Sequence, residues 1–241
     1  MNHIKILLLT ILSVGMITLQ SCKEEDSLQD NVKNEVNTVT DIDGNVYQSV
    51  VIGTQEWMTE NLKVTHYRNG DEIPRVSNVS LWCNLITGAY NWPEDSVNYL
   101  NIYGGLYNWY AVIDSRNLCP IGWHIPTIEE WMVLIDYSGG YAIAGGKLKS
   151  ARTEPEAHPR WQTPNVGATD SYGFSALPAG FTNGHAITVG GVASFWSITN
   201  ANTPSLDHED ARCIEIYADD IRASNNIWYQ YLGLSIRCIK D

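Results

Sequence analysis

The stretch LCPIGWHIPTIEEW (residues 118–131) contains the clearest local structural signal in the chain. Thr127 lies three residues before Glu130, the spacing of a capping box, in which each side chain bonds a free backbone N–H of the first helical turn. Gly139 and Gly140 end the pattern. Between the capping box and these glycines, apolar residues recur at three- and four-residue intervals, as on one helix face: Ile128, Trp131, Leu134 and Ile135. The sequence therefore predicts a helix over residues 127–137.

Before this helix, residues 38–52 alternate β-branched and polar side chains on both sides of Asp43-Gly44. This pattern is typical of a β-hairpin with a tight turn. The acidic residues around the turn have the alternate spacing of a calcium-binding loop. Where such a loop needs a glycine and a bidentate acid, however, the chain has Val46 and Ile52. We therefore expect a turn, and no motif supports a structural calcium ion.

Three further patterns complete the fold prediction. A second helix is predicted over residues 106–113, where an apolar face follows two glycines. The glycine-rich run 140–147 is one residue away from a phosphate-binding loop, but it follows a helix rather than a strand, so we interpret it as a turn. Short strands and Gly, Pro and Asn turns fill residues 161–238. Together they predict one α+β domain over residues 38–241, with short antiparallel strands, two helices and long loops.

Composition limits the possible partners. The 241-residue chain is 44% hydrophobic and 17% charged, which is too apolar for a disordered protein. It has 27 acidic against 15 basic residues and a formal net charge of -12. Such a chain lacks the basic surface that phosphate backbones need, so nucleic acid is excluded as a partner. Its aromatic residues are mainly Trp (9) and Tyr (13), whose rings carry a polar group and suit recognition surfaces.

The N-terminus carries an export signal. An apolar run extends to Leu19, too short to span a bilayer comfortably and typical of the core of a signal peptide. It ends at Leu19-Gln20-Ser21-Cys22, which resembles the bacterial lipobox, where a small residue precedes a lipid-modified cysteine. An ordinary secretory signal followed by a chance cysteine is the alternative. We expect residues 1–21 to be a lipoprotein signal peptide and Cys22 to be the lipid attachment site.

Residues 22–37 are polar and acidic and have no sustained apolar period, so we expect a flexible tether. Within it, Lys23-Glu24-Glu25-Asp26 resembles the export signal of surface lipoproteins in Bacteroidota; a plain solvated linker is the alternative. The expected location is therefore the outer membrane, with the protein exported, held by its lipid anchor and exposed at the cell surface.

Besides Cys22 the chain has four cysteines: Cys83, Cys119, Cys213 and Cys238. An even number in an exported protein favours disulfides, and four cysteines allow three pairings. Free buried thiols are the alternative. No two of these cysteines have CxxC spacing, and no histidine lies at a zinc-ligand interval from them. Metal binding through thiolates is therefore not expected.

Seven segments carry a family resemblance, in order along the chain: TVTDIDGNVYQSVVIGTQEWMTENLKV (38–64), GLYNWYAV (105–112), LCPIGWHIPTIEEW (118–131), AGGKLKS (144–150), DSYGFSALPAGF (170–181), FWSIT (195–199) and GLSIRCIKD (233–241). With them the chain resembles the Fibrobacter succinogenes major paralogous domain, a family frequent in exported proteins of Bacteroidota and Fibrobacterota. The resemblance covers nearly all of residues 38–241.

The chain is also similar to the formylglycine-generating-enzyme branch of the C-type-lectin-like fold, through PTIEEW (126–131), FWS (195–197) and RC (237–238). This resemblance implies a single C-type-lectin-like domain. It also implies that the first and last core cysteines, Cys119 and Cys238, form a disulfide. Cys213 matches no regular family cysteine, so a second bridge between Cys83 and Cys213 is only conditional.

We find no catalytic, cofactor-binding or metal-binding motif. Sugar-binding C-type lectins hold calcium with Glu-Pro-Asn or Gln-Pro-Asp and Trp-Asn-Asp triplets, where this chain has Glu154-Pro155-Glu156 and Phe195-Trp196-Ser197. The reactive cysteine pair of the formylglycine-generating enzymes has no counterpart, and no GxSxG nucleophile motif occurs. His124, just before the predicted helix, is interpreted as a buried structural histidine.

The expected function is a non-catalytic binding or adhesion module for a glycan or protein ligand, whose loops hold the specificity. Candidate contacts are aromatic residues in an Asn-rich stretch, whose flat faces could stack on a ligand: Trp82, Trp92, Tyr99 and Tyr103. For each of them, anchoring of a loop into the core is the alternative. A glycan hydrolase or oxidase-like enzyme and a structural subunit of a surface assembly are the competing functions.

The substitution Cys22→Ala tests the anchor. The variant is expected to lose lipid attachment and to move from the membrane fraction to the soluble fraction, because the acyl chains are the only membrane-binding element. Fractionation and labelling with a palmitate analogue measure this. A variant that still labels and still sediments with membranes would contradict the lipoprotein interpretation.

Overall fold

The computed structural model describes residues 37–185, 189–201 and 210–241. The expected signal peptide (1–21), the lipid site Cys22 and the tether up to residue 36 lie outside the described residues. Within the described part, no helix is long and apolar enough to cross a membrane.

The first strands of the domain join its last strand in one sheet. The sheet has the order β1-β2-β3-β11-β6, and every neighbouring pair is antiparallel. Its strands are β1 (Thr38–Thr40), β2 (Val46–Ile52), β3 (Gln55–Met58), β6 (Trp123–His124) and β11 (Ile239–Lys240). The predicted hairpin is confirmed, and the Asp41 carboxylate stabilises its turn by accepting from the N–H groups of Asp43 and Asn45 and from the Tyr47 hydroxyl.

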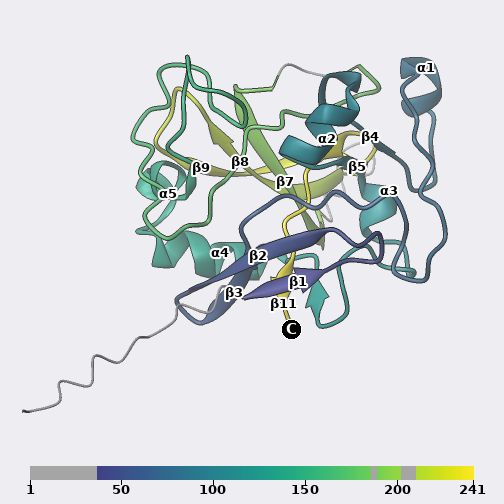
Figure 1. The fold of residues 1–241 in the computed structure, drawn as a ribbon, viewed down its shortest axis with the longest axis horizontal. Coiled ribbons are helices and arrows are strands. Elements are labelled where there is room, and N and C mark those ends of the chain that lie inside the picture. The colour runs from purple at the N-terminus through teal and green to yellow at the C-terminus, as the bar shows by residue number, and fades with distance from the viewer. Residues whose placement is uncertain (1–36, 186–188, 202–209) are drawn as a thin grey trace, which may run out of the picture. The chain divides into compact units, whose positions relative to one another are not determined.

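Two three-stranded antiparallel sheets complete the β structure (Figure 1). One has the order β10-β5-β4, with β4 (Tyr90–Asn91), β5 (Leu106–Asn108) and β10 (Gly233–Leu234). The other has the order β7-β8-β9, with β7 (Val192–Asn200), β8 (Asp210–Tyr217) and β9 (Ala223–Tyr229). The mixture of antiparallel sheets and separate helices makes this an α+β fold.

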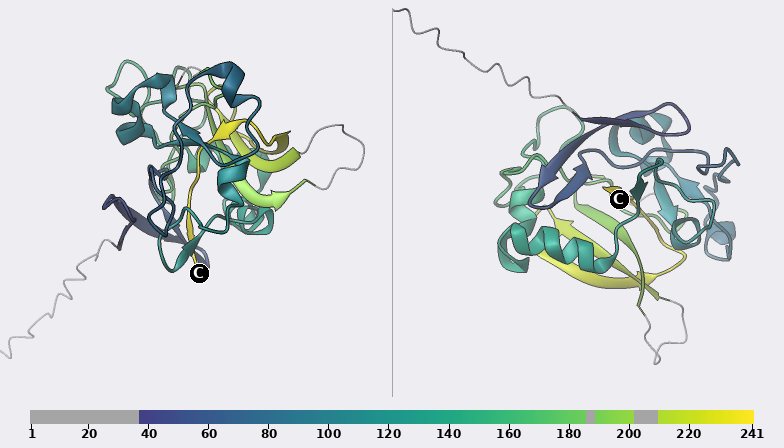
Figure 2. Two further views of the ribbon diagram at one scale, coloured as in Figure 1. Left: turned by 90° about the vertical axis from the view of Figure 1, so that its right-hand side faces the viewer. Right: turned by 90° about the horizontal axis from the view of Figure 1, so that it is seen from below.

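Short helices surround the sheets: α1 (Val79–Trp82), the 3-10 turn η1 (Pro93–Asp95), α2 (Val97–Tyr103), α3 (Trp109–Val112), α4 (Ile128–Tyr137) and α5 (Tyr141–Leu148). The predicted helix over 127–137 is confirmed as α4, and both hydrogen bonds of the capping box between Thr127 and Glu130 are present. Helices α1 and α2 lie at the end of the domain opposite the C-terminus (Figures 1 and 2).

Two sequence predictions are wrong. Residues 106–108 are strand β5 rather than helix, because they pair with β4 and β10, and only the single turn α3 follows. The glycine-rich run 140–147 is not a turn but helix α5, so the described chain contains more than the two helices expected. Its glycines serve close packing: a Cβ on Gly145 would lie 2.2 Å from the Arg222 carbonyl oxygen, and one on Gly146 would lie 2.5 Å from that of Gly167.

The core holds two large apolar clusters. One is aromatic at its centre, where Trp57 and Trp131 lie 4.8 Å apart between ring centroids and contact Phe174 and Phe195. The other surrounds the Cys119–Cys238 disulfide. Each buried aromatic side chain removes a large apolar area from water, so these clusters supply much of the driving force for folding.

A charged side chain is buried between the clusters. Arg237 is fully buried, and its guanidinium lies over the Phe174 ring. It donates hydrogen bonds to the side-chain oxygen of Asn61 and to the backbone carbonyls of Met58, Phe174 and Ser175. Burial lowers its pKa to about 9, which leaves the group charged at neutral pH. Because every acceptor is neutral, hydrogen bonds compensate the desolvation of this charge.

Of the two cysteine pairs considered, the structure contains the one that the resemblance implied. Cys119 and Cys238 form a disulfide. The conditional bridge between Cys83 and Cys213 is not formed, because both thiols are free: Cys83 is exposed just after α1, and Cys213 is buried in β8. Burial raises the pKa of the Cys213 thiol, so it remains protonated and packs as an apolar side chain.

Loss of the disulfide is expected to destabilise the domain. The double variant Cys119→Ala with Cys238→Ala frees a loop of more than a hundred residues and should lower the free energy of unfolding by about 2–5 kcal/mol. Cys83→Ser is the matched control, since it changes an exposed free thiol. Thermal and urea unfolding measure the difference, and equal stability of the double variant and the control would contradict it.

Candidate functional site

The four aromatic residues proposed as ligand contacts have different positions. Trp82 and Tyr103 are fully buried, and the Trp82 indole N–H donates to the Tyr231 carbonyl, so both are loop anchors. Trp92 is half-buried, and the Arg75 guanidinium covers its ring at 3.8 Å. Tyr99 is half-buried and lines a pocket. The structure therefore favours the anchoring alternative for Trp82 and Tyr103 and keeps Tyr99 as a candidate contact.

The pocket beside Tyr99, here called the tyrosine pocket, has a volume of about 210 Å³. Helix α2 supplies Tyr99, η1 supplies Glu94, and the segment 154–162 supplies most of the rest. Its lining residues are Glu94, Tyr99, Glu154, His158, Arg160, Gln162, Val189 and Gly190. The pocket thus combines one aromatic ring with acidic, basic and amide groups in a small space.

Two stacked tyrosines hold the aromatic wall of the tyrosine pocket. The rings of Tyr99 and Tyr103 lie 5.6 Å apart and within 8° of parallel. His158 contacts both rings edge-on, at 5.3 Å from Tyr99 and 5.7 Å from Tyr103. Its Nδ1 shares a hydrogen bond with the Tyr103 hydroxyl, and burial raises the pKa of that tyrosine. The buried ring therefore fixes the half-buried Tyr99 as a rigid surface.

The polar side of the tyrosine pocket is less constrained. The Arg160 guanidinium lies 3.6 Å from the Glu154 carboxylate and donates to the Glu156 carbonyl. The Arg160 backbone N–H donates to the Tyr103 hydroxyl, which ties this segment to α2. Glu94 is exposed and has a left-handed backbone (φ 51°, ψ 26°). No described residue forms a hydrogen bond or ion pair with its carboxylate.

Sequence reasoning missed most of this pocket. Glu154, His158 and Arg160 lie in RTEPEAHPR (152–160), where charges alternate with two prolines. That composition marks an irregular exposed segment, and such segments often carry binding residues. Nothing in the sequence indicates that the segment packs against α2, which lies about fifty residues earlier.

A second pocket is lined in part by Pro159 of the same segment. It has a volume of about 400 Å³ and contains no aromatic ring. Its lining consists of hydroxyl, amide, charged and small apolar side chains: Gln48, Thr59, Glu60, Ser150, Ala151, Arg152, Pro159, Ser175 and Leu177. Without a flat apolar surface it offers weaker discrimination than the tyrosine pocket.

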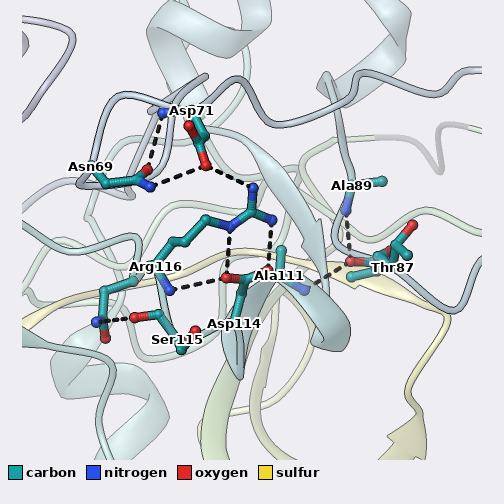
Figure 3. Close-up of polar contacts among 10 residues, drawn as sticks. Asn69, Asp71, Thr87, Ala89, Ala111, Asp114, Ser115 and Arg116 are labelled. Carbon is teal, nitrogen blue, oxygen red and sulfur yellow. Dashed lines mark hydrogen bonds and ion pairs between the residues drawn. The ribbon is translucent and has the colours of Figure 1, made fainter.

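The other polar clusters serve the fold. Arg116 donates to both carboxylate oxygens of Asp114 and to Asp71 (Figure 3). Its guanidinium also lies 3.9 Å from the centre of the Tyr67 ring. The Arg116 hydrogen bond lowers the pKa of Asp114, and Asn69 followed by Arg116 does the same for Asp71. The charged groups of this cluster, Arg116, Asp114 and Asp71, are paired with one another, so none of them is left for a ligand.

Lys149 is buried and also structural. Its ammonium group donates to the carbonyls of Val166, Tyr217 and Asp220, at 2.8, 3.0 and 2.9 Å. Burial lowers its pKa to about 8. Among the described residues, no group of three or more His, Cys, Asp or Glu side chains could hold a metal ion.

Sequence comparison places this domain in a family. A family model described as the Fibrobacter succinogenes major domain matches residues 50–240. The chain belongs to this family. No curated protein and no solved structure gives a significant match. The matched range includes every residue of the tyrosine pocket, which is therefore part of the Fibrobacter succinogenes major domain itself.

His124 of this Fibrobacter succinogenes major domain is structural, as expected, but it is half-buried rather than buried. Its Nδ1 lies 2.7 Å from Asp241, and its Nε2 lies 3.0 Å from Glu130, the capping-box residue of α4. Burial lowers the pKa of His124, but the two carboxylates outweigh burial, and the net shift is upward. The imidazole thus links Asp241 to the start of α4, and the raised pKa means that this link is stronger when the ring is protonated.

This link makes stability depend on pH. Because the pKa of His124 is raised in the folded state, its stabilisation is complete below the unfolded value of about 6.5 and is lost as the pH rises through the folded pKa. The loss of stability caused by His124→Gln should therefore be larger at about pH 6 than at about pH 8.5. Urea unfolding at both pH values measures it, with His185→Gln as control. A pH-independent difference would contradict the charged link.

Proposed function

We propose that this Fibrobacter succinogenes major domain is a lipid-anchored, surface-exposed binding module, and that its ligand is a glycan held in the tyrosine pocket. The observation that carries the proposal is the rigid Tyr99 ring bordered by polar side chains in one small pocket. Ligand sites typically combine an apolar surface with a few placed polar groups.

A sugar ring matches both halves of this lining. Its C–H face packs on an aromatic ring, and its hydroxyl groups accept and donate hydrogen bonds at the ring edge. Here Tyr99 provides the ring, and Gln162 and Arg160 provide donors beside it. The volume of about 210 Å³ is below the roughly 300–1,000 Å³ typical of drug-sized ligands, so the pocket suits a single sugar residue of a longer chain.

The pocket supports binding better than hydrolysis. A glycosidase needs two carboxyl groups, one of them kept protonated by an apolar enclosure. Glu94 and Glu154 both line the tyrosine pocket, but both are exposed, and the Arg160 guanidinium lies beside Glu154. Neither carboxyl group has the environment of a general acid, so we favour a non-catalytic module over a glycan hydrolase.

We further propose a C-type-lectin-like fold for this family member. Support comes from the Cys119–Cys238 disulfide, which connects the segment before α4 to the residue just before the last strand, β11, the pairing that the resemblance to that fold implies. The proposed surface location is supported by the lipobox-like end of the signal peptide and by the acidic run after Cys22.

A glycan array tests the binding function. The full-length protein in detergent is expected to bind a subset of glycans, and Tyr99→Ala should abolish this binding because the ring surface is lost. Tyr137→Ala is the matched control: Tyr137 also belongs to a close tyrosine pair, with Tyr172 at 5.5 Å, but lies outside the pocket. Both variants are first compared by thermal melting. Binding that survives in a folded Tyr99→Ala variant would contradict the proposed site.

A further inference from the structure

We propose that the tyrosine pocket selects a sugar residue that carries a positively charged amine, such as glucosamine, over neutral sugars. This inference rests on the glycan-binding function proposed above and adds the chemical class of the ligand. It derives from the charges that line the pocket and from the ring beside them.

The carboxylate groups that line the tyrosine pocket outnumber its permanently charged basic groups. Glu94 and Glu154 are both at its lining, and Arg160 is the permanently charged basic residue there. Arg160 is already engaged by Glu154 and by the Glu156 carbonyl. The Glu94 carboxylate thus remains without a cation among the described residues. A ligand ammonium group would supply this missing partner and form a charge-assisted hydrogen bond.

The aromatic wall strengthens the same preference. A cation within about 6 Å of an aromatic face is attracted by the negative face of the ring, and tyrosine provides such a face. The Tyr99 ring is held in place, because Tyr103 stacks on it and His158 contacts it edge-on. An amine bound near Glu94 would therefore meet both a carboxylate and a fixed ring.

An anionic ligand fits the tyrosine pocket poorly. It would have to displace Glu154 from Arg160 and would then face the uncompensated charge of Glu94. The whole chain has a formal net charge of -12, so the long-range field also repels anions and attracts cations. A lysine side chain of a peptide carries the same charge as an amino sugar. The small volume of about 210 Å³ favours the sugar, since an extended peptide needs a groove for its backbone.

Three trisaccharides with the same β-1,4 backbone separate charge from ring stacking. They are the glucosamine trimer, its N-acetylated form and cellotriose, which differ at the second carbon of each sugar. Calorimetric titration of the full-length protein in mildly acidic, low-salt buffer should give about 5- to 10-fold tighter binding of the glucosamine trimer than of the other two. Added salt should reduce this preference, because it screens the exposed ion pair.

The variant Glu94→Gln should remove the preference and leave cellotriose binding unchanged, since glutamine keeps the size of the side chain and one acceptor oxygen but loses the charge. Glu72→Gln is the matched control, because it removes an exposed carboxylate outside the pocket. In contrast, Tyr99→Ala should abolish the binding of all three sugars.

The remaining outcomes of the titrations are distinguishable from one another. Equal binding of the three sugars that still depends on Tyr99 would overturn the amine preference and leave the glycan-binding function in place. No binding of any glycan here or on the array would overturn the proposed function itself. Tighter, Glu94-dependent binding of a trilysine peptide than of the glucosamine trimer would overturn the sugar assignment and identify a basic peptide as the ligand.

Discussion

The buried guanidinium of Arg237 is the interaction on which the rest of the domain depends. A charge cannot be removed from water without compensation, and here every hydrogen-bond acceptor of the guanidinium is a neutral oxygen. These oxygens belong to the end of β3, to Asn61 and to the turn at residues 174–175. All three must therefore be in place when the C-terminal segment folds, and the neighbouring Cys119–Cys238 disulfide holds that segment there.

Hydrogen bonds connect the surroundings of Arg237 to the tyrosine pocket. Asn61 accepts from the guanidinium and donates through its amide to the Tyr103 carbonyl, at the end of α2. On the other side, Ala176 follows the turn that binds Arg237, and its carbonyl accepts from the Trp161 indole. The helix and the segment that form the two walls of the pocket are thus attached to the same buried cation.

How much of this was predictable depends on the range of the interactions. The α4 capping box and the first hairpin involve residues a few positions apart, so their patterns are visible in the sequence. Strand pairing overrode the helical pattern at residues 106–108. The glycines of α5 suggest a turn in the sequence, but the helix needs them because the backbones of Gly167 and Arg222 approach it closely. No local sequence pattern indicates this approach.

The candidate site shows the same limit. Tyr99 could be proposed from its aromatic character alone, and Trp82 and Tyr103 had the same character but are buried. Burial is decided by packing against segments far away in the chain. The partners of Tyr99 were missed because the segment 154–162 meets α2 only in the folded protein.

The edge position of β1 has a mechanical consequence. Among the strands that the structure describes, β1 pairs with β2 alone, and it lies at the end of the domain away from α2 (Figure 1). If a ligand and the proposed lipid anchor were to pull on the domain, tension would enter at the first residue of β1 and would separate the strands one residue pair at a time. Because β2 also pairs with β3, strand separation would stop once β1 has detached from β2. The detachment of β1 would thus absorb mechanical work while the remaining structure stays folded.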